Sequence, residues 1–222
     1  MIVGVLGFIG SGKGTVGEIL AEQGFHTISF GSAVKDVAAT MFGWERVLLE
    51  GDTEFSRQFR EQPDAYWSRE FGFEFTPRKA LQLMGTQVGR DIFHPNLWVI
   101  KAKQQMHTLM SMGMENFVIT DVRFPNEMAM IHDEGGILIE VQRGIQPHWM
   151  SVAARANRGD SKANKFMEEQ GIHESEWKWI GHEIDYTVDN DRTKEDLKKK
   201  VITCLKRSFG SSIISESNEG VL

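Results

Sequence analysis

Short apolar runs alternate with longer amphipathic segments along most of the chain. A short apolar run that ends at a glycine or a polar residue is typical of a buried parallel strand. Such runs predict strands over residues 2–6, 26–30, 117–120, 137–141 and 185–188. The amphipathic segments predict helices over residues 13–23, 33–41, 78–89, 96–112, 125–134 and 194–207. Because strands joined by helical segments form parallel sheets, we expect an α/β fold with a five-stranded parallel sheet flanked by helices.

Two segments depart from this alternation. Residues 44–77 are rich in aromatic and charged side chains, and with the helix that follows they predict a helical insertion over 44–95. Residues 143–182 separate the last two predicted strands and carry several arginines and lysines. This segment is typical of a lid-like insertion, and a solvated basic loop is the alternative. We expect one domain over 1–209 and a frayed, serine-rich tail over 210–222.

A glycine-rich loop follows the first predicted strand and leads directly into the first predicted helix. Its sequence, GFIGSGKGT, fits the phosphate-loop pattern G-x-x-x-x-G-K in the strand–loop–helix context that the motif requires. Glycines let successive backbone N–H groups point inward as an anion nest, and the helix N-terminus adds partial positive charge. We therefore expect a nucleoside triphosphate site rather than a simple helix-capping turn, with phosphate contacts from Gly10, Ser11, Gly12, Lys13, Gly14 and Thr15.

Candidate metal ligands lie in this loop and after a later strand. The residue after Lys13 is Gly14, and the hydroxyl that usually ligates a metal comes one position later, at Thr15. Asp121 follows the apolar run 117–120, and the carboxyl ends of parallel strands face the ligand crevice. We expect Thr15 and Asp121 to hold Mg²⁺, directly or through water. An Asp121 that caps the following helix is the alternative.

Arginines beside these residues are candidates for phosphoryl transfer. Arg123 would leave the same crevice as Asp121, where a guanidinium stabilises charge on a transferring phosphoryl group. Glu127 lies one helical turn further on, and we expect it to orient Arg123 by a salt bridge. Arg143 directly follows the fourth predicted strand and would close over the phosphates. For each arginine the alternative is a solvated surface charge.

A polar stripe over the predicted helix 78–89 and two further residues are candidates for substrate binding. Polar residues recur there every four positions, beside an apolar face, and such a stripe could grip a phosphate and the edges of a base. A solvated polar face is the alternative. Lys35 could equally be a surface lysine, and Trp98 a core residue. The candidate set is Lys35, Arg78, Gln82, Thr86, Arg90 and Trp98.

The composition restricts what the chain binds. It contains 25 Lys and Arg against 31 Asp and Glu, a net charge of −6, which disfavours a nucleic-acid polymer as a partner. Cys204 is the single cysteine, so we expect a buried structural thiol rather than a disulfide or a metal cluster. His173–Glu176 is interpreted as a helix start rather than a metal site. No apolar stretch has the length of a membrane-spanning helix, and the apolar run 2–6 lacks a basic leader, so we expect a cytoplasmic protein.

Together these blocks resemble the deoxynucleoside monophosphate kinases of tailed bacteriophages, a P-loop family. The resemblance runs from Gly7 to Asn190 and depends on the order and spacing of blocks at 7–15, 30–35, 81–86, 120–127, 141–143, 173–176 and 186–190. It implies the three-layer fold of P-loop NTPases over 1–209, with 44–95 as the substrate-binding insertion and 143–182 as the lid. The location would be the host-cell cytoplasm if a phage encodes the chain.

The resemblance also implies a reaction, in which the γ-phosphate of ATP passes to a deoxynucleoside 5′-monophosphate with Mg²⁺ and gives ADP and the diphosphate. Lys13 and Arg123 would serve the transfer, together with Arg143 from the lid. Lys35 and the stripe from Arg78 to Arg90 would hold the monophosphate. The partners would be small-molecule substrates, and a homodimer is compatible with the sequence.

Three other functions stay open at this point. Dephospho-coenzyme A kinases share the expected architecture and use a different acceptor. A non-catalytic ATP-binding module would keep the phosphate loop but has no need of a second, arginine-lined site. A nucleic-acid-end kinase is disfavoured by the acidic composition.

We predict that Lys13→Ala lowers turnover by on the order of a thousandfold or more while the protein stays folded, because phosphoryl transfer depends on electrostatic stabilisation of the phosphates. Steady-state kinetics and circular dichroism of the purified variant test this expectation. A folded variant with near-normal turnover would remove Lys13 from the mechanism.

Overall fold

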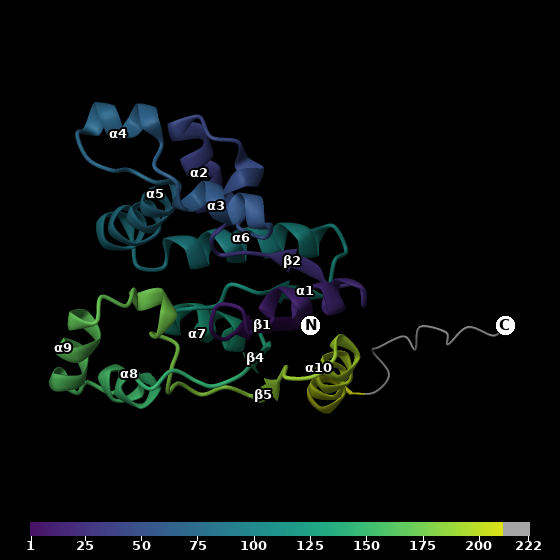
Figure 1. The fold of residues 1–222 in the computed structure, drawn as a ribbon. Helices are drawn as coiled ribbons and strands as arrows, with labels where there is room; N and C mark the ends of the chain where they lie inside the picture. Colours follow the sequence, from purple (N-terminus) through teal and green to yellow (C-terminus); the bar gives the residue numbers. More distant parts are fainter. Residues whose placement is uncertain (211–222) are drawn as a thin grey trace. The chain divides into compact units, whose positions relative to one another are not determined.

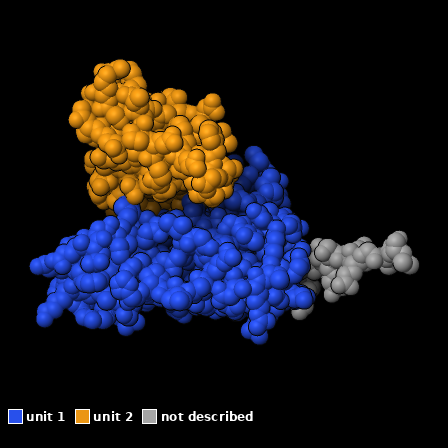
Figure 2. All heavy atoms as spheres, viewed as in Figure 1, with its two compact units in different colours: residues 1–28, 106–222 blue, residues 29–105 orange. Residues whose placement is uncertain are grey.

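The computed structural model describes residues 1–210 and divides into two compact units. Unit 1 comprises residues 1–28 and 106–222, and unit 2 comprises residues 29–105 (Figure 2). The tail predicted over 210–222 lies outside the described residues from position 211 on. The second unit is larger than the predicted insertion over 44–95, since its core also uses the helix that begins at Ser32.

A five-stranded sheet forms the centre of unit 1. Its strands are paired in the order β2-β3-β1-β4-β5, and every pair is parallel (Figure 1). This confirms the predicted parallel sheet. The strands are β1 (Ile2–Leu6), β2 (His26–Ile28), β3 (Phe117–Ile119), β4 (Ile137–Gln142) and β5 (Tyr186–Asp189).

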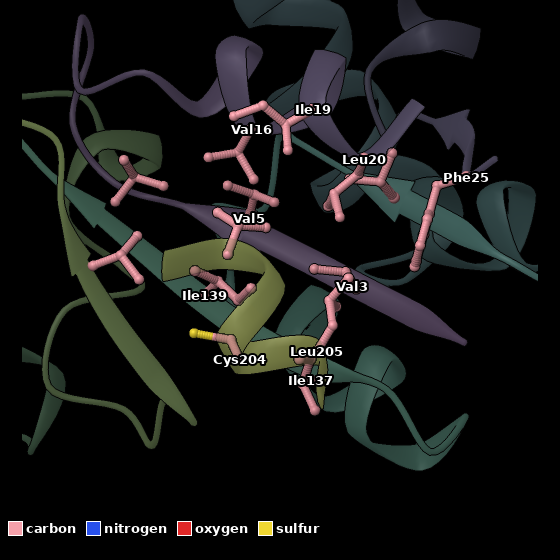
Figure 3. Packing of buried hydrophobic residues seen from close by; sticks show 14 of the residues in the cluster. Val3, Val5, Val16, Ile19, Leu20, Phe25, Ile137, Ile139, Cys204 and Leu205 are labelled. Atoms are coloured by element: carbon pink, nitrogen blue, oxygen red, sulfur yellow. The ribbon is translucent and has the colours of Figure 1, made fainter. Parts of the chain in front are cut away.

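Both faces of the central strand β1 are covered by helices. One face of β1 and β4 packs against α1 (Lys13–Ala21) and α10 (Lys194–Phe209), and the Cys204 thiol of α10 is buried in this cluster as predicted (Figure 3). The opposite face packs against α7 (Pro125–Asp133). A Cβ at Gly4 would lie 2.4 Å from Ile131 Cδ1 and 2.7 Å from Leu138 Cδ2, so the glycine gives α7 room to approach the sheet. The side chains packed between these strands and helices include Val3, Val5, Val16, Ile19, Leu20, Ile137, Ile139, Cys204 and Leu205.

The strand order places the segments that carry the candidate residues at one edge of the sheet. The chain crosses from β1 to one side of the sheet for β2 and β3, and then to the other side for β4 and β5. Because all strands are parallel, the loops that follow β1, β3, β4 and β5 leave at the same edge. The phosphate loop, Asp121, Arg143 and Asn190 begin or lie within these loops.

The predicted lid segment is helical and belongs to unit 1. It contains α8 (Met150–Asn157), α9 (Ser161–Glu169) and the short 3₁₀ helix η3 (Glu174–Glu176). His173 precedes η3, and its Nδ1 accepts a hydrogen bond from the Ser175 N–H at 3.2 Å. The interpretation of His173–Glu176 as a helix start therefore holds. Within the described residues there is no group of three His, Cys, Asp or Glu that could hold a metal ion.

Unit 2 consists of short helices around a small apolar core. The core contains Val34, Ala38, Trp44, Leu49, Phe75, Ala80, Met84 and Trp98. The helices are α2 (Ser32–Phe42), η1 (Arg46–Leu49), α3 (Glu54–Glu61), α4 (Ala65–Phe71), α5 (Pro77–Leu83), η2 (Met84–Phe93) and the first part of α6 (Leu97–Ser111). None of the helices that the structure describes is long and apolar enough to cross a membrane.

The helix predicted over 78–89 changes its winding, and to that extent the prediction was wrong. The α-helix ends at Leu83, and residues 84–93 form the π-helix η2. Trp98 packs against this segment: its indole N–H donates to the Gly85 carbonyl at 2.8 Å. A Cβ at Gly89 would lie 2.5 Å from the Trp98 ring, so only glycine permits this packing. Periodicity alone does not reveal such a tertiary contact.

Candidate functional site

The phosphate loop between β1 and α1 has the backbone geometry of an anion nest. Gly7 and Gly12 adopt φ values of +137° and +108°, which L side chains rarely adopt. A Cβ at Gly7 would lie 2.4 Å from the Val141 carbonyl oxygen. A Cβ at Gly10 or Gly14, in contrast, would meet no atom within 4 Å. The loop is therefore held tightly where it touches the sheet and is open elsewhere.

The phosphate loop buries the hydroxyl group of Ser11. Ser11 is only 4% exposed, and its Oγ has no hydrogen-bond partner among the described residues. Buried hydroxyl groups in proteins are nearly always paired, because an unpaired one costs about 1–3 kcal/mol. A hydroxyl, glycine N–H groups and a helix N-terminus together fit a chain of phosphates.

Lys13 lies at the start of α1 and folds back over the loop. Its Nζ donates to the carbonyl oxygens of Gly7 and Phe8, each at 2.8 Å. Burial and, to a smaller extent, the positive charge of Arg123 together lower the pKa of Lys13 to about 8, against the opposing effect of Glu176 and Asp121. The fold thus brings Lys13, Asp121 and Arg123 into electrostatic range of one another, as the sequence led us to expect.

Arg123 is held by a residue that we did not predict. Its Nη1 lies 2.6 Å from Glu176 Oε1 and 3.4 Å from the Ser175 carbonyl oxygen. The expected salt bridge from Glu127 was wrong. The buried Glu127 carboxylate instead accepts the backbone N–H groups of Arg123 at 2.6 Å and Phe124 at 3.0 Å, because free N–H groups at the start of α7 attract a carboxylate one turn later.

Residues far apart in the sequence complete the site. Glu176 is 53 residues from Arg123, and no local pattern distinguishes it from the other acidic residues of η3. The Phe8 ring packs edge-on against Trp149 and Trp179, with centroids 5.5 and 5.2 Å apart. The predicted lid segment therefore contacts the phosphate loop through aromatic side chains and pairs with Arg123 through Glu176.

The arginines of the lid segment differ in their surroundings. Arg143 is exposed and makes no hydrogen bond or ion pair with its side chain in the described part of the chain. Arg155 pairs with Asp160 at 2.5 Å, and Arg158 is exposed at the end of α8. Arg143 thus follows β4 as predicted, but no hydrogen bond or ion pair among the described residues joins its side chain to the loop.

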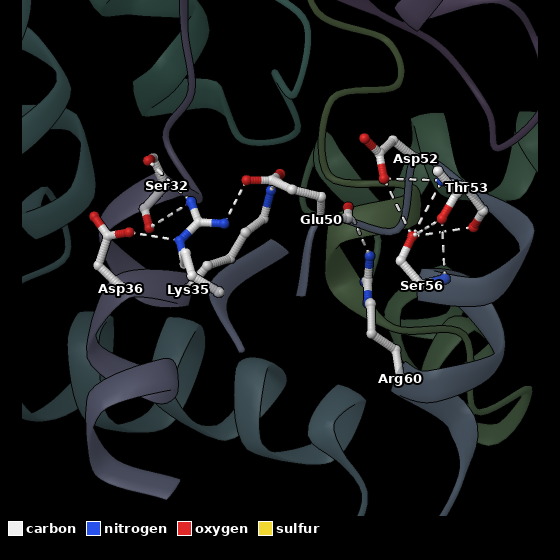
Figure 4. Close-up of polar contacts among 9 residues, drawn as sticks. Ser32, Lys35, Asp36, Glu50, Asp52, Thr53, Ser56 and Arg60 are labelled. Carbon is white, nitrogen blue, oxygen red and sulfur yellow. Dashed lines mark hydrogen bonds and ion pairs between the residues drawn. The ribbon is translucent and has the colours of Figure 1, made fainter. Parts of the chain in front are cut away.

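In unit 2, Lys35 belongs to a compact charge cluster. Its Nζ lies 2.5 Å from Glu50 Oε2, and Glu50 also binds Arg46, which reaches Asp36 at 2.5 Å (Figure 4). Burial by itself would raise the pKa of Glu50. The hydrogen bonds from Lys35 and Arg46 outweigh it, so the pKa of Glu50 is lowered. Lys35 is therefore not a free surface lysine, and any anion that binds it competes with Glu50.

The polar stripe of unit 2 runs across two kinds of helix. Arg78 on α5 is ion-paired with Glu61, and Gln82 is exposed on the same helix. Thr86 and Arg90 are half-buried on the π-helix η2. Trp98, in contrast, lies in the core of unit 2 and is only 9% exposed. In this structure it is a core residue, the alternative to a substrate-binding role.

Comparison with known proteins identifies two sequence relatives. No family model matches the chain. A protein described as a deoxynucleotide monophosphate kinase, from Acanthamoeba polyphaga mimivirus, is 32% identical over 155 residues, which cover 64% of this chain and 74% of that protein. The deoxynucleoside-5′-monophosphate kinase of Escherichia phage T5 is 41% identical over 58 residues, which cover 26% of this chain and 22% of that protein.

Solved structures with a similar arrangement are more distant. Dephospho-CoA kinase from Campylobacter jejuni has a TM-score of 0.44 and 17% identity, over 93% of this chain and 96% of that chain. Shikimate kinase from Aquifex aeolicus has a TM-score of 0.39 and 16% identity, over 95% of this chain and 100% of that chain.

The lowered pKa of Lys13 predicts a pH dependence of ATP binding. Phosphates bind the protonated amine, and the free protein loses this proton as the pH rises through about 8. Above that pH the affinity falls by up to about tenfold per pH unit, and binding takes up a proton. Calorimetry at pH 9 in two buffers of different ionisation enthalpy measures this uptake. Binding without proton uptake at pH 9 would contradict the prediction, and Lys13→Met is the control that abolishes the uptake.

Proposed function

The chain belongs to the deoxynucleotide monophosphate kinase family, and from this premise we propose that it transfers the γ-phosphoryl group of ATP to a deoxynucleoside 5′-monophosphate. The products are ADP and the deoxynucleoside diphosphate. The observation that carries the proposal is the phosphate loop, in which the Ser11 hydroxyl has no partner among the described residues and Lys13 donates to the loop carbonyl oxygens. Such a loop recognises a chain of phosphates, and the family relationship supports a nucleotide as acceptor.

In this proposal the loop holds the ATP phosphates through its backbone. The N–H groups from Gly10 to Thr15 donate to phosphate oxygens, and Lys13 moves from the carbonyl oxygens of Gly7 and Phe8 to the phosphates. Thr15 and Asp121 would hold Mg²⁺, which neutralises phosphate charge when it is bound. Two oxygen ligands from the protein fit this ion, because Mg²⁺ in kinase sites keeps several waters and phosphate oxygens as ligands.

Arg123 serves the transfer itself. Its guanidinium, held by Glu176, stabilises the negative charge on the oxygens of the transferring group. The acceptor is a phosphate that is already ionised at neutral pH, so the reaction needs no general base. The charged side chains that act on Lys13 are Arg123, Glu176 and Asp121. Arg143, exposed after β4, would join the phosphates from the lid segment.

The acceptor residues proposed for unit 2 are Lys35 and the stripe of Arg78, Gln82, Thr86 and Arg90. Lys35 and Arg78 are each paired with a carboxylate, Glu50 and Glu61 respectively. A dianionic monophosphate offers more charge than either carboxylate and would displace it from the cation.

The acceptor is tested by release of ADP from Mg·ATP with a panel of phosphate acceptors. The panel contains the common deoxynucleoside monophosphates, their ribonucleotide counterparts and dephospho-coenzyme A. We expect stimulation by at least one deoxynucleoside monophosphate, with mass spectrometry identifying the diphosphate product. Lys13→Ala, purified in parallel, measures the contribution of contaminating kinases.

Three results would contradict the proposal. Activity with dephospho-coenzyme A alone would assign a different acceptor. ATP binding without stimulation by any acceptor would leave a nucleotide-binding module. Activity that persists at the same level in the Lys13→Ala preparation would trace the signal to another enzyme.

The pairing of Arg123 with Glu176 predicts that their substitutions are not additive. We expect Arg123→Ala to lower kcat by about a thousandfold and Glu176→Gln by about tenfold. The double variant should be no worse than Arg123→Ala alone, because Glu176 acts through Arg123. The matched control is Glu174→Gln on the same short helix, where the carboxylate forms an ion pair with Lys178 at 3.8 Å. Additive losses would show that Glu176 acts independently of Arg123.

A further inference from the structure

Asn190 contacts the phosphate loop from the end of β5. Its Nδ2 donates to the Ser11 carbonyl oxygen at 2.8 Å, across 179 residues of sequence. Its backbone N–H donates to the Gln142 carbonyl oxygen at 2.7 Å, which continues the β4–β5 ladder by one residue. The backbone of Asn190 is therefore held by the sheet, and this fixes the position from which its side-chain amide contacts the loop.

Gly12 lets this amide come close to the loop. A Cβ at Gly12 would lie only 2.2 Å from Asn190 Nδ2, so any side chain at that position would expel the amide. Gly12 also has a φ of +108°, which other residues rarely adopt. The glycine thus meets two requirements at once, the backbone turn and the space for Asn190.

The contact determines the orientation of one peptide group. The Ser11–Gly12 peptide is planar and trans, so its C=O and its N–H point in opposite directions. With the Ser11 carbonyl directed at Asn190, the Gly12 N–H points away from Asn190. A carbonyl that accepts a hydrogen bond also polarises its peptide and makes the N–H a stronger donor.

We propose that Asn190 is a positioning residue for the phosphates of the nucleotide: by binding the Ser11 carbonyl oxygen, its amide aims the Gly12 N–H at a phosphate oxygen. The inference rests on the proposed function only in taking the ligand of the loop to be a phosphate chain. Asn190 touches no phosphate itself and acts through the Ser11–Gly12 peptide. Without its amide, this peptide is free to rotate, and a donor is lost from the nest.

The test uses inorganic tripolyphosphate, which contains the phosphates without base or sugar. Calorimetry should show that Asn190→Ala and Asn190→Asp each bind it about tenfold more weakly than the wild type, the effect of one lost hydrogen bond. Asn190→Asp keeps the shape of the side chain and removes the donor but adds a negative charge that repels phosphates. Asn190→Leu, which has a similar branched shape and no charge, should show the same loss of about tenfold and answers the question if Asn190→Ala fails to fold. The matched control is Asn164→Ala, which removes an amide that donates to the Ala156 carbonyl oxygen at 3.1 Å.

A second readout separates positioning from a structural role. In the wild type, tripolyphosphate should shift the ¹H–¹⁵N signal of Gly12, and this shift should be reduced in Asn190→Asp while the shift of the Lys13 amide persists. Unchanged affinity in a folded Asn190 variant, or an equal loss in Asn164→Ala, would overturn the inference. Because tripolyphosphate binding requires no acceptor, these results are independent of whether a deoxynucleotide is phosphorylated.

Discussion

The position of β1 in the middle of the sheet is the constraint on which the site depends. β1 pairs with β3 on one side and with β4 on the other, and helices cover both of its faces. Its end therefore cannot move without disrupting two ladders and the core. The phosphate loop begins at that end, so its backbone amides are oriented before a ligand arrives. Preorganised donors of this kind lower the cost of charge stabilisation during the reaction.

Electrostatic balance explains how two cations share one small site. Burial is the main penalty on the positive charge of Lys13, and the nearby positive charge of Arg123 adds to it. Glu176 and Asp121 offset this repulsion. Under the proposed function, the phosphates of the nucleotide supply more negative charge than these two carboxylates, so that bound phosphates would stabilise both cations further.

Predictability differed between local and tertiary features. The sheet and the phosphate loop were predictable because the strand at Ile2–Leu6 is apolar throughout and the loop motif depends on consecutive residues. The pairing of Arg123 was not, because Glu127 and Glu176 are both acidic and the nearer one in sequence caps the backbone of α7 instead. The winding of 84–93 escaped prediction for a similar reason, since Trp98 packs on Gly89 from a different helix.

The sequence by itself determined the α/β fold, the place of the phosphate loop and the presence of Lys13 at the start of a helix. Each of these follows from neighbouring residues, through hydrophobic periodicity or through the freedom of glycine. Only the tertiary structure decided which side chains surround the loop. Glu176 reaches Arg123 and Asn190 reaches Ser11 because a parallel sheet brings the ends of distant strands to one edge, and no pattern within a single segment records that neighbourhood.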